Sequence, residues 1–511
     1  MELSPAPPGL HAEYAELFST DCLYFLGELI STFDEDVDRI LQLRASRKVQ
    51  LDLSGDLPNF LESTAHIRAD TSWGVLPVPP RLQKRHVDVG DTAPCDTQRF
   101  IRALQSTAQG IQVDFDDGNC PTFYNQIKGI HTVVQAVRSL LPDVPHISEA
   151  PVLMLRPRAW NMVEHNMMVG GKEVPGPLFD FGLLMFHCGM TLFQNQSGPF
   201  FYLSKVESFL EARLWNKIFL WTQQKLGLPA GSIKATVLIE NVLAAFEMDE
   251  ILFELREHSA GLNCGIWDYS ASFVNKFGHR RTFLLPDRSK YVNMEKHFLR
   301  SYMDLLVKTC HQRGALATGG MAAALLPQDL LSGSHRDVLA AVKRLKLLEI
   351  HAGVDGFMVY DLNLVGPMQE GGVTLYGLKH NISVGILFIN AWLSGKGHFF
   401  YRGQVEDSAT AEISRSQVWQ WIRHQTWLED GSRVVNRRLV KELIQELLVE
   451  LSAVCHSVRS KQRLNTAADM FLEVVLQRNF PEFLTSYLNQ DHTFLSWQST
   501  ELESALQRSK L

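Results

Sequence analysis

The chain repeats one unit, in which a short apolar run ends on a charged residue or a glycine and is followed by a stretch with helical spacing. Apolar runs without alternation are typical of parallel strands that are buried on both faces. Repeated strand–helix units predict an α/β fold, a TIM-type (β/α)₈ barrel. An open doubly wound sheet is the alternative, and the lack of a GxGxxG motif after a first strand counts against it. The runs lie at 111–117, 152–156, 200–205, 236–240, 262–268, 315–320 and 356–361, with a possible eighth at 398–407.

Both flanks of the predicted barrel have helical patterns. The N-terminal flank combines helical spacing with a Pro-rich extended passage around Pro77, Pro79 and Pro80, so it is expected to wrap the barrel rather than form its own core. Beyond residue 407 the strand pattern stops and helical spacing resumes. We therefore expect three domains, namely an N-terminal helical clasp (1–100), the barrel (101–407) and a C-terminal helical plug (408–511).

Composition excludes several classes of partner. The 49 Lys and Arg against 56 Asp and Glu give a formal charge of −7, so attraction to nucleic acid is not expected. The seven cysteines are scattered without CxxC spacing, which indicates neither a disulfide framework nor a zinc site. No membrane partner is expected, because apolar stretches such as 235–255 are interrupted by carboxylates.

The last three residues, Ser509, Lys510 and Leu511, form the tripeptide that a peroxisomal import receptor reads as an address. The polar residues Gln507 and Arg508 before it would keep the tail solvated. The sequence therefore predicts the peroxisome (glyoxysome) as the location and the import receptor as a partner.

Charged residues at the ends of the apolar runs are candidates for chemistry, because the active site of such a barrel lies at the carboxyl ends of its strands. Glu240 and Asp268 could together hold Mg²⁺, which prefers oxygen ligands and usually takes one or two carboxylates. A solvated strand end, or a helix N-cap for Asp268, is the alternative. Arg156 could clamp a carboxylate or stabilise a developing oxyanion, although either it or Arg158 could be structural.

One long segment carries a specific resemblance. Residues 256–269, with the sequence REHSAGLNCGIWDY, resemble the signature of the A-type malate synthases of glyoxysomes and bacteria. The resemblance extends over almost the whole chain in the same order, and further matching segments lie at 57–60, 114–117, 156–158, 178–181, 233–236, 319–323 and 406–415.

The resemblance implies condensation of acetyl-CoA with glyoxylate and hydrolysis of the thioester to malate and CoA. By residue, it implies that Glu240 and Asp268 hold Mg²⁺, that Arg156 is the catalytic arginine and that Asp407 removes the methyl proton. A weak carbon acid such as a thioester methyl needs a fixed positive charge at the enolate oxygen, which is the role implied for Arg156.

The same resemblance implies supporting roles for two further groups of residues. Asp114 and Asp116 match an acidic pair that orders metal-bound water. Gly265, Ile266 and Trp267 match a substrate-binding segment.

Departures from the family pattern leave two alternatives open. The stretch 356–402 differs from the pattern and is shorter, so a peroxisomal pseudoenzyme is one alternative. A malyl-CoA or citramalyl-CoA lyase is the other, because it would share the barrel and the metal chemistry but release no free CoA.

Overall fold

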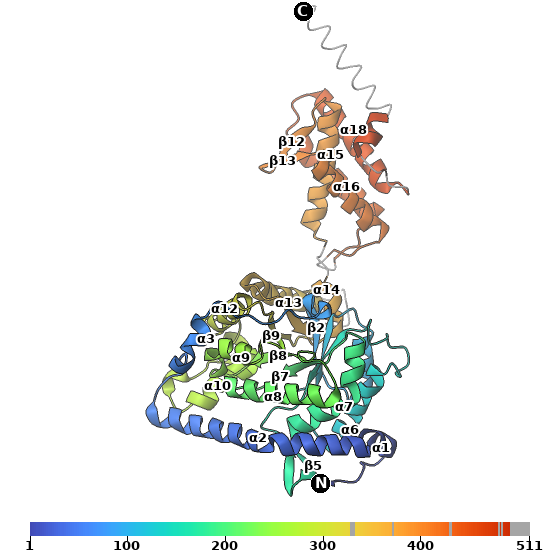
Figure 1. Cartoon of the computed structure of the whole chain (residues 1–511). Helices are drawn as coiled ribbons and strands as arrows, with labels where there is room; N and C mark the ends of the chain where they lie inside the picture. Colours follow the sequence, from blue (N-terminus) through green and yellow to red (C-terminus); the bar gives the residue numbers. More distant parts are fainter. Residues whose placement is uncertain (328–332, 370–372, 429–431, 479–480, 482–483, 491–511) are drawn as a thin grey trace, which may run out of the picture. The chain divides into compact units, whose positions relative to one another are not determined.

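The computed structural model describes residues 1–327, 333–369, 373–428, 432–478, 481 and 484–490. It divides the chain into two compact units. The first consists of Met1–Leu326 with Asp337–Glu370, and the second of Pro327–Arg336 with Gly371–Leu511. Each unit has its own hydrophobic core. Figure 1 shows the helices and strands of each unit.

Eight parallel strands close the barrel of the first unit, which confirms the predicted fold class. Side chains of the central strands are buried on both faces, as the unbroken apolar runs predicted. In their order around the barrel the strands are β10 (Ala317–Ala322), β11 (Gly356–Val359), β2 (Val87–Thr92), β3 (Gly110–Asp114), β4 (Val152–Arg156), β7 (Phe200–Leu203), β8 (Lys234–Ile239) and β9 (Ser259–Cys264).

The proposed eighth strand at 398–407 is wrong. This segment forms an antiparallel hairpin of β12 (His398–Tyr401) and β13 (Gln404–Asp407), which belongs to the second unit. Arg402 and Gly403 make its turn with φ values of 48° and 81°. The missing barrel strand is β2, so the barrel begins inside the range 1–100 that was predicted as the clasp.

The N-terminal region is largely helical, as expected. It contains β1 (Glu2–Leu3), α1 (His11–Leu17), α2 (Thr20–Ser54) and α3 (Ala65–Ala69). The side chain of Ser19 caps α2 by accepting a hydrogen bond from the Cys22 N–H, and Gly55 ends the helix with φ 72°. The long α2 packs its apolar side chains against two barrel helices, α7 (Gly176–Gln194) and α8 (Phe209–Leu226) (Figure 1).

In the part of the chain that the structure describes, α7 is long and apolar enough to cross a membrane, but 78% of that stretch is buried, as in the core helix of a soluble protein.

The other connections of the barrel unit are mostly helical. The remaining α-helices and β-strands are α4 (Pro80–Gln83), α5 (Thr97–Leu104), α6 (Phe123–Val137), β5 (Val163–Val169), β6 (Lys172–Pro175), α9 (Met248–Glu254), α10 (Ile266–Phe277), α11 (Arg288–Tyr291), α12 (His297–Gln312), α13 (Gly333–Ala352) and α14 (Val365–Gln369).

The second unit is a bundle of helices around one apolar core. Gly385 and Phe471 are in close contact there, since a Cβ at Gly385 would overlap the Phe471 ring. The unit already includes the helix before the hairpin, so it starts upstream of the predicted residue 408. Its helices are α15 (Leu375–Leu393), α16 (Ser408–Arg423), α17 (Arg437–Ser452), α18 (Val458–Leu476) and α19 (Leu484–Gln490).

Candidate active site

Arg156 lies at the centre of a charged cluster at the carboxyl ends of the barrel strands. It ends β4, where its Cα is in register with that of Asp114 at the end of β3. Its Nη2 lies 2.5 Å from Asp117 Oδ2 and 3.9 Å from Glu240 Oε1. Its Nη1 lies 3.4 Å from Asp114 Oδ2, and the side chain is only 3% exposed. A buried guanidinium is thus fixed at the position that the sequence predicted for a catalytic arginine.

Three carboxylates beside Arg156 could hold a metal ion. Asp117, Glu240 and Asp268 each offer one oxygen, and these oxygens lie within 4.8 Å of one another. The structure therefore brings the predicted pair together and adds Asp117. Asp268 is the third residue of α10, not the end of a strand. Hard oxygen donors at this spacing suit Mg²⁺.

The electrostatics of Glu240 fit a cation at this place. Burial, with a contribution from Asp268, raises the pKa of Glu240 to about 8, although Arg156 and Lys205 oppose the shift. A carboxylate that is buried beside another carboxylate is stabilised in its charged form by a bound cation.

Gly265 allows α10 to begin close to the acidic cluster. A Cβ at this position would lie 2.6 Å from the Cβ of Glu240, so a side chain does not fit. The Gly265 N–H donates to the hydroxyl of Tyr302, which in turn donates to the carbonyl of Ile239. Ile266 and Trp267 follow in the first turn of α10, which has no side-chain cap. Their backbone N–H groups have no partner within the helix, which suits an anionic ligand.

The two predicted supporting carboxylates, Asp114 and Asp116, are bound by protein groups. Asp114 accepts hydrogen bonds from the N–H groups of Asp116 (2.8 Å) and Gly118 (2.7 Å), which shapes the loop after β3. Asp116 accepts from the Ala159 N–H at 3.1 Å and from Lys205 Nζ at 2.6 Å. Neither belongs to the group of three carboxylates described above.

Lys205 is a site residue that the sequence analysis missed. Its N–H donates to Glu240 Oε1 at 2.6 Å, and its Nζ lies 2.6 Å from both Asp116 Oδ2 and Asp117 Oδ1. Burial alone would lower the pKa of the Lys205 ammonium, but the carboxylates outweigh it and raise this pKa. The signal was available, because Lys205 ends the apolar run 200–205 as Glu240 ends the run 236–240.

Arg158 has a structural role. It is buried and forms ion pairs of 2.9 Å with both Asp180 and Glu164. Of the two arginines in this motif, Arg156 alone belongs to the charged cluster around Glu240.

Asp407 lies in the second unit, at the end of β13. Its Oδ1 accepts hydrogen bonds from the N–H groups of Ala409 (2.9 Å) and Thr410 (3.2 Å), so it caps α16. The side chain is exposed. The neighbouring Glu406 is buried, with its Oε1 4.0 Å from His380 Nε2.

A cavity of about 370 Å³ lies beside the first turn of α10. Trp267 and the glycine-containing end of β10 line it, and Arg288 and Arg344 add positive charge, while Lys346 is paired with Glu349 in the same lining at 3.0 Å. The guanidinium of Arg288 lies 5.2 Å from the centre of the Trp267 ring. The cavity thus combines an apolar lining with cations that suit an anionic ligand.

Comparison with known proteins identifies relatives over most of the chain. Residues 152–366 match the family described as "Malate synthase, TIM barrel domain", and residues 372–491 match "Malate synthase, C-terminal". A malate synthase of Dictyostelium discoideum is 38% identical, over 92% of this chain and 93% of the relative. One of Myxococcus xanthus is 39% identical, over 93% and 94%. The glyoxysomal malate synthase of Cucumis sativus is 35% identical, over 93% and 91%.

Proposed function

The chain belongs to the malate synthase family, and from this premise we propose how its residues carry out the reaction. The enzyme is an acyltransferase of the glyoxylate cycle, which converts acetyl-CoA and glyoxylate to malate and CoA. The observation that carries the residue assignment is the group of three carboxylates, Asp117, Glu240 and Asp268, beside the buried Arg156.

Mg²⁺ is the proposed cofactor, held by Glu240 and Asp268, with Asp117 as a further oxygen donor. When bound, it would act as a Lewis acid and hold glyoxylate in place. Support comes from the short separation of the carboxylate oxygens and from the raised pKa of Glu240. Asp114 and Asp116 would order water near the ion, and the segment Gly265, Ile266 and Trp267 would bind the substrate through its backbone.

The carbon–carbon bond forms after a proton is removed from acetyl-CoA. Asp407 takes a proton from the acetyl methyl group, and the charge that develops on the thioester oxygen is stabilised by Arg156. The resulting carbon nucleophile attacks the aldehyde carbon of glyoxylate as the C=O π bond breaks, and the oxygen takes a proton from water to become the hydroxyl of the product. Asp407 gives its proton back to the solvent. Water then hydrolyses the thioester and releases CoA. The proposed reaction therefore needs Asp407 as its base and Arg156 as the positive charge at the thioester oxygen.

The alternatives predict different products. A lyase would release no free CoA, and a pseudoenzyme would release almost none. Arg156, Glu240, Asp268 and Asp407 are all present, and the relatives named malate synthase cover both units.

The test is a thiol assay of CoA release from acetyl-CoA. We expect release that requires both glyoxylate and added Mg²⁺. Formation of an acyl-CoA product without free CoA would support the lyase, and no turnover with a folded protein would support the pseudoenzyme.

We also propose import into the peroxisome. The support is the C-terminal tripeptide Ser509, Lys510 and Leu511, which lies outside the described residues, and the glyoxysomal relative from Cucumis sativus. The partner for this step is the peroxisomal import receptor.

A further inference from the structure

The turn between β7 and α8 connects the group of three carboxylates, Asp117, Glu240 and Asp268, to the N-terminal helix α2. Lys205 lies in this turn with a φ of 53°. A non-glycine residue rarely adopts this left-handed conformation, and it persists where surrounding contacts hold it. Contacts on both sides of Lys205 must therefore supply the restraint.

One side of Lys205 faces the proposed metal site. Its N–H donates to Glu240 Oε1 at 2.6 Å, and its ammonium bridges Asp116 and Asp117 at 2.6 Å each. Lys205 thus orients Glu240, a proposed ligand of the metal, and Asp117, a second carboxylate of the same group.

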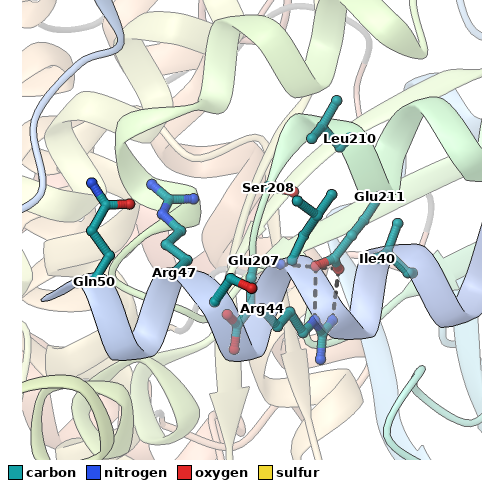
Figure 2. Close-up of a pocket in the computed structure, with 10 residues that line it drawn as sticks. Ile40, Arg44, Arg47, Gln50, Glu207, Ser208, Leu210 and Glu211 are labelled. Atoms are coloured by element: carbon teal, nitrogen blue, oxygen red, sulfur yellow. Dashed lines mark hydrogen bonds and ion pairs between the residues drawn. The ribbon is translucent and has the colours of Figure 1, made fainter. Parts of the chain in front are cut away.

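Arg44 of α2 holds the other side of Lys205. Its Nη2 donates to the Lys205 carbonyl at 2.8 Å and also to Glu211 Oε2 at 2.6 Å, while its Nε donates to Glu211 Oε1 at 2.8 Å. Figure 2 shows this two-pronged pairing of Arg44 with Glu211 at the edge of the cavity between α2 and the turn.

Glu211 completes the connection. Its side chain is 1% exposed, and it also accepts a hydrogen bond from the Glu207 N–H at 3.2 Å. One buried carboxylate therefore joins α2 through Arg44, the turn through Glu207 and its own helix, α8. A bidentate pair of this kind has a fixed geometry, which a lysine could not reproduce.

We propose that Arg44 is a positioning residue for the metal site, acting from α2 through the carbonyl of Lys205 to fix Glu240. This inference rests on the proposed role of Glu240 as a ligand of Mg²⁺. It assigns the N-terminal helix a part in metal affinity, in addition to its packing against the barrel.

Arg47 offers a matched control on the same helix. It forms a 2.8 Å ion pair with the buried Glu247, which also accepts a hydrogen bond from the Phe209 N–H. Arg47 therefore anchors α2 to the barrel unit in a similar way, but among the described residues it does not hydrogen-bond to Lys205. Figure 2 shows both arginines projecting from α2.

The test is calorimetric titration of the full-length protein with Mg²⁺ alone, together with thermal unfolding. We expect Arg44→Gln to weaken Mg²⁺ binding by roughly 10-fold, as for other residues that orient metal ligands, and Arg44→Lys by less. Arg47→Gln should lower the unfolding temperature by a similar amount to Arg44→Gln and leave the Mg²⁺ affinity unchanged. At saturating Mg²⁺, Arg44→Gln should recover most of its turnover.

The outcomes separate the two proposals. If the wild type does not bind Mg²⁺, the metal assignment itself fails, and the role of Arg44 fails with it. If the wild type binds Mg²⁺ but Arg44→Gln binds it equally well, or Arg47→Gln weakens it as much, the positioning role alone is wrong. Should Arg44→Gln not fold, Arg44→Lys decides, since unchanged Mg²⁺ affinity in that variant would contradict the proposal.

Discussion

Three residues, Asp117, Glu240 and Asp268, give the proposed metal site its negative charge. Replacing Asp268 is the most direct test of this site. Asp268→Asn keeps the size of the side chain but removes the charge that a cation requires. We expect Mg²⁺ and glyoxylate binding to weaken together, each by at least roughly 10-fold, because the metal would hold the substrate. Calorimetry of both ligands measures this effect.

The control for Asp268 is Asp304→Asn in α12, which removes an exposed carboxylate that pairs with Arg300. It should leave both affinities unchanged. Undiminished Mg²⁺-dependent glyoxylate binding by Asp268→Asn would return Asp268 to a structural role in the first turn of α10.

A buried histidine makes the stability of the barrel depend on pH. His258 is fully buried, with its Nδ1 2.9 Å from Asn216 Oδ1 and its Nε2 3.1 Å from the side-chain nitrogen of Gln223. Burial, with a smaller contribution from Lys234, lowers the pKa of His258 from 6.5 to about 4. The folded state therefore favours the neutral ring.

The stability contributed by neutral His258 is fully present above pH 6.5 and is lost as the pH falls from 6.5 to about 4. The shift corresponds to a loss of about 3 kcal/mol. Urea unfolding at several pH values should show this loss in the wild type and a flatter profile in His258→Gln. Parallel profiles for the two proteins would contradict the assignment.

At the scale of elements, the connection between β9 and α10 permits no side chain at Gly265. Gly265→Ala would place a methyl group 2.6 Å from the Cβ of Glu240 and 3.0 Å from its Oε2. We expect the displaced Glu240 to lower Mg²⁺ affinity and malate formation by on the order of 10-fold or more. Gly366→Ala in α14 is the control, because a Cβ there meets no atom within 4 Å. Equal behaviour of the two variants would show that the contact is accommodated.

The sequence predicted seven of the eight barrel strands and missed β2, in which two aspartates interrupt the apolar pattern. β2 has the sequence VDVGDT, and its buried Asp88 is compatible with the barrel interior because Arg85 pairs with it at 2.7 Å. Arg85 lies only three residues before Asp88, but the interrupted apolar pattern does not indicate that this charged pair is buried. The run 398–407 was misassigned because its central Arg402 and Gly403 form a hairpin turn.

The residues of the candidate site that lie at the ends of predicted strands could be predicted from the sequence. Arg156 and Glu240 follow apolar runs, and the structure brings Asp268 to them as expected. Arg44 was not predictable, because its contact with the site depends on how α2 packs across the barrel helices, and 161 residues separate it from Lys205. The roles of Gly265, Ile266, Trp267 and Asp407 stay predictions.

At the scale of the whole molecule, the proposed peroxisomal address can be tested separately from the enzymatic activity. Deleting Ser509, Lys510 and Leu511 shortens only a polar C-terminal tail, so the shortened protein should fold, keep its turnover and accumulate in the cytosol. Fluorescence microscopy of tagged proteins, with the tag at the N-terminus, measures the distribution. Peroxisomal import of the shortened protein would contradict the address.

The proposed mechanism depends most directly on Asp407 as the base. Asp407→Asn tests it cleanly, because asparagine is as good a helix N-cap as aspartate and should preserve the start of α16. It cannot accept the methyl proton. Glu406→Gln is the matched comparison, since it neutralises the adjacent carboxylate.

The decisive measurement is malate turnover and Mg²⁺-dependent glyoxylate binding for Asp407→Asn and Glu406→Gln side by side. We expect Asp407→Asn to bind both ligands normally while kcat falls by on the order of 10²- to 10⁴-fold, and Glu406→Gln to retain most of its turnover. A dead Glu406→Gln beside an active Asp407→Asn, or full turnover in both variants, would contradict the account.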